Sequence, residues 1–131
     1  MNKTDKILGD IDASANLAVK NLSVSKKFYE ETLGLTKIEA EEEEVIAFKS
    51  GNTTIYVYQS QNAGTNKATA VTWVVGEDLE DIVNKLKAKG VTFEHYDMPD
   101  MTRENDIHIF GEMTVAWFKD PDGNILNITS R

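Results

Sequence analysis

The chain has 131 residues, enough for one domain with its own core but not for two independent ones. Its 22 acidic and 14 basic side chains give a formal charge of −8, so nucleic acids and anionic membranes are not expected as partners. Cysteine is absent, which excludes disulfides, thiolate metal ligands and a thiol nucleophile.

The first ten residues are polar and lack the apolar stretch of a signal peptide. No apolar run in the chain approaches the ~20 residues that a membrane helix needs. We therefore expect a cytoplasmic protein without a membrane segment.

The first half of the chain alternates polar and apolar residues and then changes to helical spacing. Asn21 is a suitable helix N-cap, and Phe28, Tyr29 and Leu33 follow as one helical stripe. Gly34 is the expected end of this helix. The predicted elements are a strand at 16–22, a helix at 22–34, a strand at 36–40, a polar turn at 41–44 and a hairpin at 45–58.

The second half shows the same order of signals. Leu79, Ile82, Val83 and Leu86 lie at i, i+3, i+4 and i+7, which is typical of one helix face, and Gly90 is expected to end the helix. The predicted elements are a strand at 70–75, a helix capped by Asp78, a strand at 91–96 and a hairpin at 114–128.

The two predicted hairpins also match each other, because each has Phe-Lys before its turn and Gly-Asn within it. This repeat predicts an α+β fold in which two β-α-β-β-β modules form curved mixed sheets around a cavity. We expect a single domain over residues 1–131, with module one at about 11–60 and module two at about 68–131. A polar, glycine-containing linker at 60–67 is expected to be a flexible connection.

Two stretches carry a resemblance to a known family. Asn21-Leu22 followed by Ser25, Phe28-Tyr29 and Leu33-Gly34 is the first, and residues 117–126, with the run Asp-Pro-Asp-Gly-Asn at 120–124, are the second. Over about residues 11–128 the chain resembles the vicinal oxygen chelate (VOC) superfamily. This superfamily includes glyoxalase I, extradiol dioxygenases, methylmalonyl-CoA epimerase, and the fosfomycin and bleomycin resistance proteins. The resemblance implies paired β-α-β-β-β modules, often in a homodimer whose two chains build each cavity.

The resemblance also implies the positions at which metal-dependent members hold a divalent ion with His, Gln or Glu. In this chain those positions fall on Ser14, Tyr56, Ala70 or Val71, and Asn127. These side chains do not make a competent site for a divalent metal, and shifting the alignment by one residue gives no better set. We therefore expect no metal and no cofactor.

The chain has two histidines, His95 and His108, both in or beside residues 94–112. With neighbouring acidic residues they would allow a different metal site, but a solvated, acidic surface loop is the favoured interpretation. The apolar residues of this segment would let it form a cavity rim or contact a neighbouring chain. Packing against the rest of the chain explains the same residues and is the favoured interpretation.

No catalytic residue is assigned, because no inward-facing Asp or Glu is evident on the predicted strands. Trp73 and Trp117 are expected to divide between the core and the cavity, where an indole can stack on an aromatic or cationic ligand. The favoured hypothesis is a metal-free protein that binds a small molecule, as an antibiotic or metabolite sequestering protein does, and forms a homodimer. The alternatives are a glyoxalase-like lyase, isomerase or dioxygenase with a relocated metal site, and a protein-interaction module. The predicted ligand-binding residues are Ser14, Tyr56, Val71, Trp73, Trp117 and Asn127.

Overall fold

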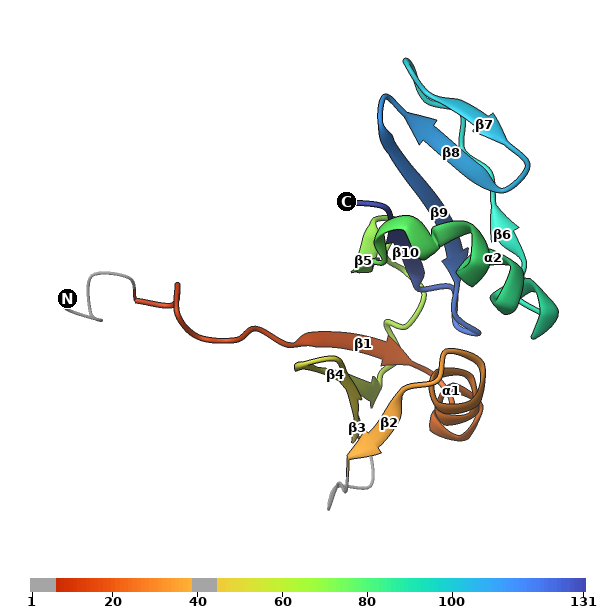
Figure 1. The fold of residues 1–131 in the computed structure, drawn as a ribbon. Helices are drawn as coiled ribbons and strands as arrows, with labels where there is room; N and C mark the ends of the chain where they lie inside the picture. The colour runs from red at the N-terminus through yellow and green to blue at the C-terminus, as the bar shows by residue number, and fades with distance from the viewer. Residues whose placement is uncertain (1–6, 39–44) are drawn as a thin grey trace.

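The computed structural model describes residues 7–38 and 45–131. Within these ranges two sheets, each with its own helix, lie side by side (Figure 1). The first sheet has the order β1-β4-β3-β2, with β1 parallel to β4 and the other pairs antiparallel. The sequence-predicted turn at 41–44 and the last two residues of the strand predicted at 36–40 lie outside the described residues. The strands are β1 (Ala15–Val19), β2 (Thr36–Ile38), β3 (Val45–Ser50) and β4 (Thr53–Gln59).

The second sheet repeats this topology and adds a hairpin. Its order is β5-β10-β9-β8-β7, and β6 pairs with β9 beyond the end of β8. The expectation of a surface loop at 95–112 is therefore wrong in part, because this segment contains the antiparallel pair β7–β8. The expected α+β fold with two β-α-β-β-β modules is confirmed. The strands are β5 (Thr69–Val74), β6 (Phe93–Glu94), β7 (Thr102–Glu104), β8 (Ile107–Phe110), β9 (Met113–Lys119) and β10 (Ile125–Thr129).

Each half has one helical segment after its first strand. In the first, α1 (Leu22–Lys27) continues as a π-helical turn, η2 (Phe28–Thr32), and the predicted cap is confirmed because Asn21 Oδ1 accepts the Val24 N–H at 3.2 Å. In the second, a 3-10 turn, η3 (Gly76–Asp78), precedes α2 (Leu79–Ala88). Asp78 makes no capping hydrogen bond, because its backbone is already wound into this turn. Among the described residues no helix is long and apolar enough to cross a membrane.

One face of each sheet packs against its helix, and the two helix-facing sides share one hydrophobic core. Successive strand residues point to opposite faces, so the side chains between the core positions lie on the far side of each sheet. We call this far side the open face of each sheet. The core includes Leu17, Val19, Phe48, Ile55 and Val57 of the first sheet and Ala116, Phe118, Leu126 and Ile128 of the second.

The turn between β9 and β10 is organised by a buried carboxylate. Asp120 Oδ1 accepts the N–H groups of Asp122 at 2.9 Å and Asn124 at 2.8 Å. Its Oδ2 accepts the Asn124 Nδ2 at 2.8 Å and the Tyr29 hydroxyl, on η2, at 2.7 Å. Burial, followed by the nearby Asp120 charge, raises the pKa of Tyr29, so this hydroxyl keeps the proton that it donates.

The same turn contacts the first module at further points. Asn124 Nδ2 donates to the Ala18 carbonyl of β1 at 2.8 Å. Asp122 Oδ1 accepts the Lys20 N–H at 3.0 Å, and its Oδ2 accepts the Ser25 hydroxyl at 3.3 Å. The Asp-Pro-Asp-Gly-Asn run therefore joins the two modules and does not form part of an open face.

The linker at 60–67 also packs against this turn. Ala63 is buried, and Gly64 has φ +76° with its Cα facing the backbone of Asp122. A Cβ at Gly64 would overlap the carbonyl oxygen of Asp122, so only glycine fits here. The linker, expected to be a flexible connection, is packed against the body of the protein at this point.

Replacing Tyr29 by Phe is expected to lower the free energy of unfolding by about 1–2 kcal/mol, because it removes one donor from a buried carboxylate. Urea denaturation measures this loss. Tyr58→Phe, at an exposed tyrosine of β4, is the matched control and should change the stability by less than about 0.5 kcal/mol. Equal stability of the two variants would contradict the role assigned to the Tyr29–Asp120 bond.

Candidate functional site

Two rows of side chains cross the open face of the second sheet. Residues that pair across strands lie on the same face, so the register defines each row. The first row runs Thr72, Asn127, Trp117 and Glu94, on β5, β10, β9 and β6. The second row runs Val74, Thr129, Val115 and His108, on β5, β10, β9 and β8.

Three aromatic rings meet on this face. The Trp117 ring contacts the His108 ring edge to face at 4.9 Å between centroids and the Tyr96 ring at 5.2 Å. The indole Nε1 donates to the Thr69 hydroxyl at 3.1 Å, which holds the ring across β10 toward β5. The face therefore presents an aromatic wall beside the polar side chains of β10.

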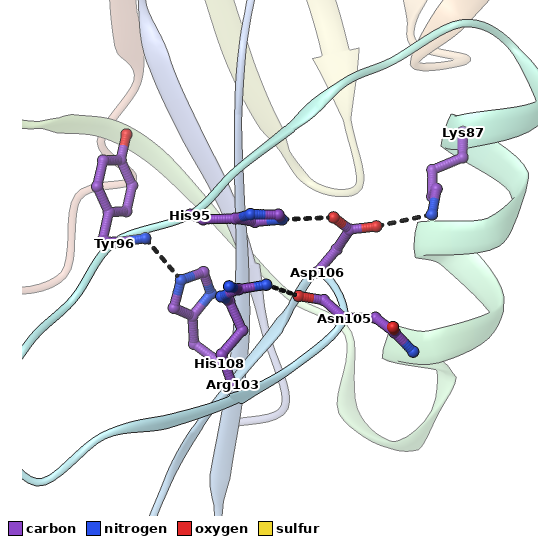
Figure 2. A network of polar contacts seen from close by, with 7 residues as sticks. All are labelled: Lys87, His95, Tyr96, Arg103, Asn105, Asp106 and His108. Atoms are coloured by element: carbon purple, nitrogen blue, oxygen red, sulfur yellow. Dashed lines mark hydrogen bonds and ion pairs between the residues drawn. The ribbon is translucent and has the colours of Figure 1, made fainter.

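His108 is fully buried in this wall, with 0% of its surface exposed. Its Nε2 accepts the Tyr96 N–H at 2.9 Å, so the neutral ring carries its proton on Nδ1 (Figure 2). Burial lowers the pKa of His108, and the charges of Arg103 and His95 act in the same direction. The expectation of a solvated loop is wrong for this residue, and the signal for it was its place between two isoleucines of a short strand.

The open face of the second sheet also holds four buried polar atoms without a hydrogen-bond partner among the described residues. A buried polar group without a partner is costly, so a group of them is typical of a surface that contacts a ligand or ordered water. Sequence reasoning missed three of the four residues, because only the pairing of β6, β8 and β10 with β9 brings them together. The atoms are Tyr96 Oη, His108 Nδ1, Asn127 Oδ1 and Thr129 Oγ1.

The open face of the first sheet is more exposed and more apolar. Tyr56 and Tyr58 of β4 are each 37% exposed, and they line a shallow hollow of about 420 Å³ with Asn16 and Val45. Asn16 pairs with Tyr56, and Val45 pairs with Tyr58, so all four share this face.

The six sequence-predicted site residues do not all lie on the open faces. Tyr56 lies on the first open face, and Trp117 and Asn127 lie together on the second. Ser14 is exposed and immediately precedes β1.

Val71 and Trp73 lie on the helix-facing side, because they pair with Leu126 and Ile128 and pack against the core. There they border a hollow of about 350 Å³ between the two sheets, where Trp73 Nε1 donates to the Ser50 hydroxyl at 2.8 Å. The residue of β5 that faces the same way as Asn127 is Thr72. The two tryptophans were expected to divide between the core and the cavity. The strand register places Trp73 on the core side and Trp117 on the open face.

The open-face residues at or beside the positions implied for metal ligands do not fit a divalent metal ion. Tyr56, Thr72 and Asn127 supply phenol, hydroxyl and amide groups, not the carboxylates and imidazoles that such an ion prefers. Over residues 7–38 and 45–131 no group of three or more His, Cys, Asp or Glu side chains is placed to hold a metal. The rings of His95 and His108 lie 6.4 Å apart, but the first bonds to Asp106 and the second to the Tyr96 N–H.

One carboxylate on the open face was missed by sequence reasoning. Glu94 pairs with Trp117 and therefore shares its face, although no inward-facing acid was expected. Its Oε1 lies 3.6 Å from Lys119 Nζ. The face of a residue in a two-residue strand such as β6 follows from its pairing partner, which no local pattern reveals.

Comparison with known families finds one match. The family model of the Glyoxalase/Bleomycin resistance protein/Dioxygenase superfamily matches residues 11–128. A search of curated protein sequences finds no match.

Solved structures with the same fold include three with related names. A lactoylglutathione lyase from Agrobacterium tumefaciens has a TM-score of 0.68 at 15% identity, covering 92% of this chain and 92% of that one. The fosfomycin resistance protein FosX from Listeria monocytogenes has a TM-score of 0.65 at 15% identity, covering 92% and 90%. A glyoxalase/bleomycin resistance protein from Streptomyces sp. CB03234 has a TM-score of 0.63 at 18% identity, covering 89% and 97%.

The buried neutral ring of His108 predicts a pH dependence of stability. Because its pKa is lower in the folded state than the ordinary 6.5, the unfolded chain binds the proton first as the pH falls below about 7. The stability of the native protein is therefore expected to fall between about pH 7 and about pH 5 more steeply than that of His108→Gln, whose side chain does not titrate. Urea denaturation across this range measures the difference, and parallel losses in the two proteins would contradict it.

Proposed function

Because the chain belongs to the Glyoxalase/Bleomycin resistance protein/Dioxygenase superfamily, we propose that it binds a small amphipathic molecule on the open faces of its sheets, without a divalent metal ion. The observation that carries this proposal is the group of four unpaired, buried polar atoms beside Trp117 on one open face. Most buried polar atoms have a hydrogen-bond partner, so four atoms without one on the same face point to a ligand or to ordered water.

The open face of the second sheet has the composition of a small-molecule site. The rings of Trp117 and Tyr96 supply apolar area, and Asn127 Oδ1 and the Thr129 hydroxyl supply an acceptor and a donor. His108 Nδ1–H is a further donor, since its Nε2 is already occupied by the Tyr96 N–H. A ligand with an apolar body and one or two polar groups matches this set.

We further propose that the functional unit is a homodimer. Five large exposed apolar side chains lie on the two open faces, three on the first and two on separate strands of the second, and exposed apolar area of this kind marks an interaction surface. A second copy related by a two-fold axis would cover both patches at once and enclose the ligand between chains. The residues are Ile38, Tyr56 and Tyr58 on the first open face and Val74 and Phe110 on the second.

The position of Glu94 supports a second candidate, a glyoxalase-like lyase or isomerase. Its carboxylate lies on the open face beside Trp117, where a general base for such chemistry would stand. Turnover of S-lactoylglutathione that is lost in Glu94→Gln would favour this candidate over simple binding.

Replacing Asn127 by Ala is expected to weaken ligand binding by about tenfold, equivalent to about 1.4 kcal/mol, without lowering the melting temperature. The reason is that Asn127 Oδ1 has no partner among the described residues, so its removal breaks no bond of the fold. Calorimetric titration and thermal shift with bleomycin, fosfomycin and the dye 1-anilinonaphthalene-8-sulfonate measure both effects. Tyr56→Ala is expected to weaken binding in the same way.

Asn124→Ala is the matched control, because Asn124 holds both Asp120 and the Ala18 carbonyl and its loss should lower the melting temperature. If Asn127→Ala destabilised the protein as much as this control, Asn127 would be structural. If none of the three probes bound the native protein, the binding proposal itself would fail.

Replacing Tyr58 by Glu is expected to convert a dimer into a monomer of 14.7 kDa, because it places a charge in the apolar patch of the first open face. Sedimentation velocity measures the mass. Ser23→Glu, on the exposed side of α1, adds the same charge away from both open faces and should leave the dimer intact. A native protein that sediments as a monomer would overturn this part of the proposal.

A further inference from the structure

The hairpin β7–β8 creates a second hollow, separate from the open faces. A groove of about 810 Å³ lies between this hairpin and α2, compared with about 420 Å³ for the hollow on the first open face. Figure 1 shows the hairpin extending past α2 at one end of the second sheet. Ile109 pairs with Thr114, which alternates with the open-face residue Val115, so the groove lies on the helix-facing side.

The floor of the groove is apolar. Ile107 and Ile109 of β8 contribute half-buried side chains, and Leu79 and Val83 of α2 form the adjoining wall. The volume is within the range of about 300–1,000 Å³ that is usual for small-molecule sites.

A network of three charged or titratable side chains fixes the hairpin to the helix (Figure 2). Asp106, in the β7–β8 turn, bonds through Oδ2 to Lys87 Nζ of α2 at 2.7 Å and through Oδ1 to His95 Nε2 at 2.8 Å. The hydrogen bonds from Lys87 and His95 hold the pKa of Asp106 below its usual range. This network joins the hairpin to α2 and to the segment after β6 within the lining of the groove.

The groove is lined by more carboxylates than cationic side chains. Five carboxylates face three cationic side chains, and each of the three cations has a partner. Lys87 bonds Asp106, Arg131 bonds Glu112 at 2.6 Å, and Arg103 donates to the Asn105 carbonyl at 2.5 Å. Three of the carboxylates have no ion pair or hydrogen bond with any residue in the described ranges, namely those of Glu77, Glu80 and Glu104.

We propose that this groove is a second binding site, specific for a small organic cation with an apolar body. The apolar floor accepts the body of the ligand, and the unpaired carboxylates of Glu80 and Glu104, on opposite walls, attract its charge. An anion is disfavoured, because the groove carries more carboxylates than cationic side chains. Because the carboxylates are exposed to solvent, the affinity decreases as the salt concentration rises.

The probe for this site is 4-phenylbutylammonium, and 4-phenylbutanol is its uncharged counterpart with the same apolar body. In amide-detected NMR titrations of the native protein, the cation is expected to shift the signals of Val83, Ile107 and Ile109. The alcohol is expected to bind at least about fivefold more weakly, because it lacks the charge that the carboxylates attract. Signals of the open face, such as those of Thr72 and Thr129, should not move.

The double variant Glu80→Gln with Glu104→Gln is expected to lower the affinity for the cation to the affinity measured for the alcohol. Glu31→Gln, at an exposed acid outside the groove, is the control for a general change of charge. Asn127→Ala should leave the affinity for the cation unchanged, so this test is independent of the open-face proposal. The proposal is overturned if the alcohol binds as tightly as the cation, if the double variant binds as the native protein does, or if the shifts map to the open face.

Discussion

The arrangement of the two modules depends on one buried carboxylate, that of Asp120. Four donors surround it, and one of them, the Tyr29 hydroxyl, comes from the other module. A buried charge is tolerated only when hydrogen bonds replace its lost water, so the turn at 120–124 and the helix η2 are stable only together. Asn124 and Asp122 extend the contact to β1 and α1. The Asp-Pro-Asp-Gly-Asn run at 120–124 thus has a structural role, because it connects the two modules. The open faces lie outside this contact.

The second sheet carries different chemistry on its two sides. Its open face presents Trp117, His108 and the unpaired groups of β10, whereas its helix-facing side carries the core and, between α2 and the β7–β8 hairpin, the acidic groove. Alternation along β8 places His108 on one side and Ile107 and Ile109 on the other. A single inserted hairpin therefore contributes to both proposed sites, and a ligand in one does not contact the other.

The buried ring of His108 positions the backbone of the segment that follows β6. Its ring accepts the Tyr96 N–H, and Tyr96 packs on Trp117, so the conformation of the segment after β6 depends on a neutral imidazole. The preceding residue, His95, points to the other side of the sheet and bonds Asp106. The two histidines thus have separate structural roles. His95 bonds Asp106 in the β7–β8 turn, and His108 accepts the Tyr96 N–H.

Local signals in the sequence were sufficient to predict the repeated β-α-β-β-β order, the cap at Asn21 and the helix ends at Gly34 and Gly90, both of which have positive φ. These features depend on residues that are close together in the sequence, so short stretches of sequence are enough to predict them. Of the predicted ligand-binding residues, Tyr56, Trp117 and Asn127 lie on the open faces. The tertiary structure decided which face each strand residue occupies, because a period of two defines two faces but only pairing and helix packing decide which one is covered. This is why Val71 and Trp73 belong to the core side, why Glu94 and His108 belong to the open face, and why the hairpin that builds the groove was expected as a loop.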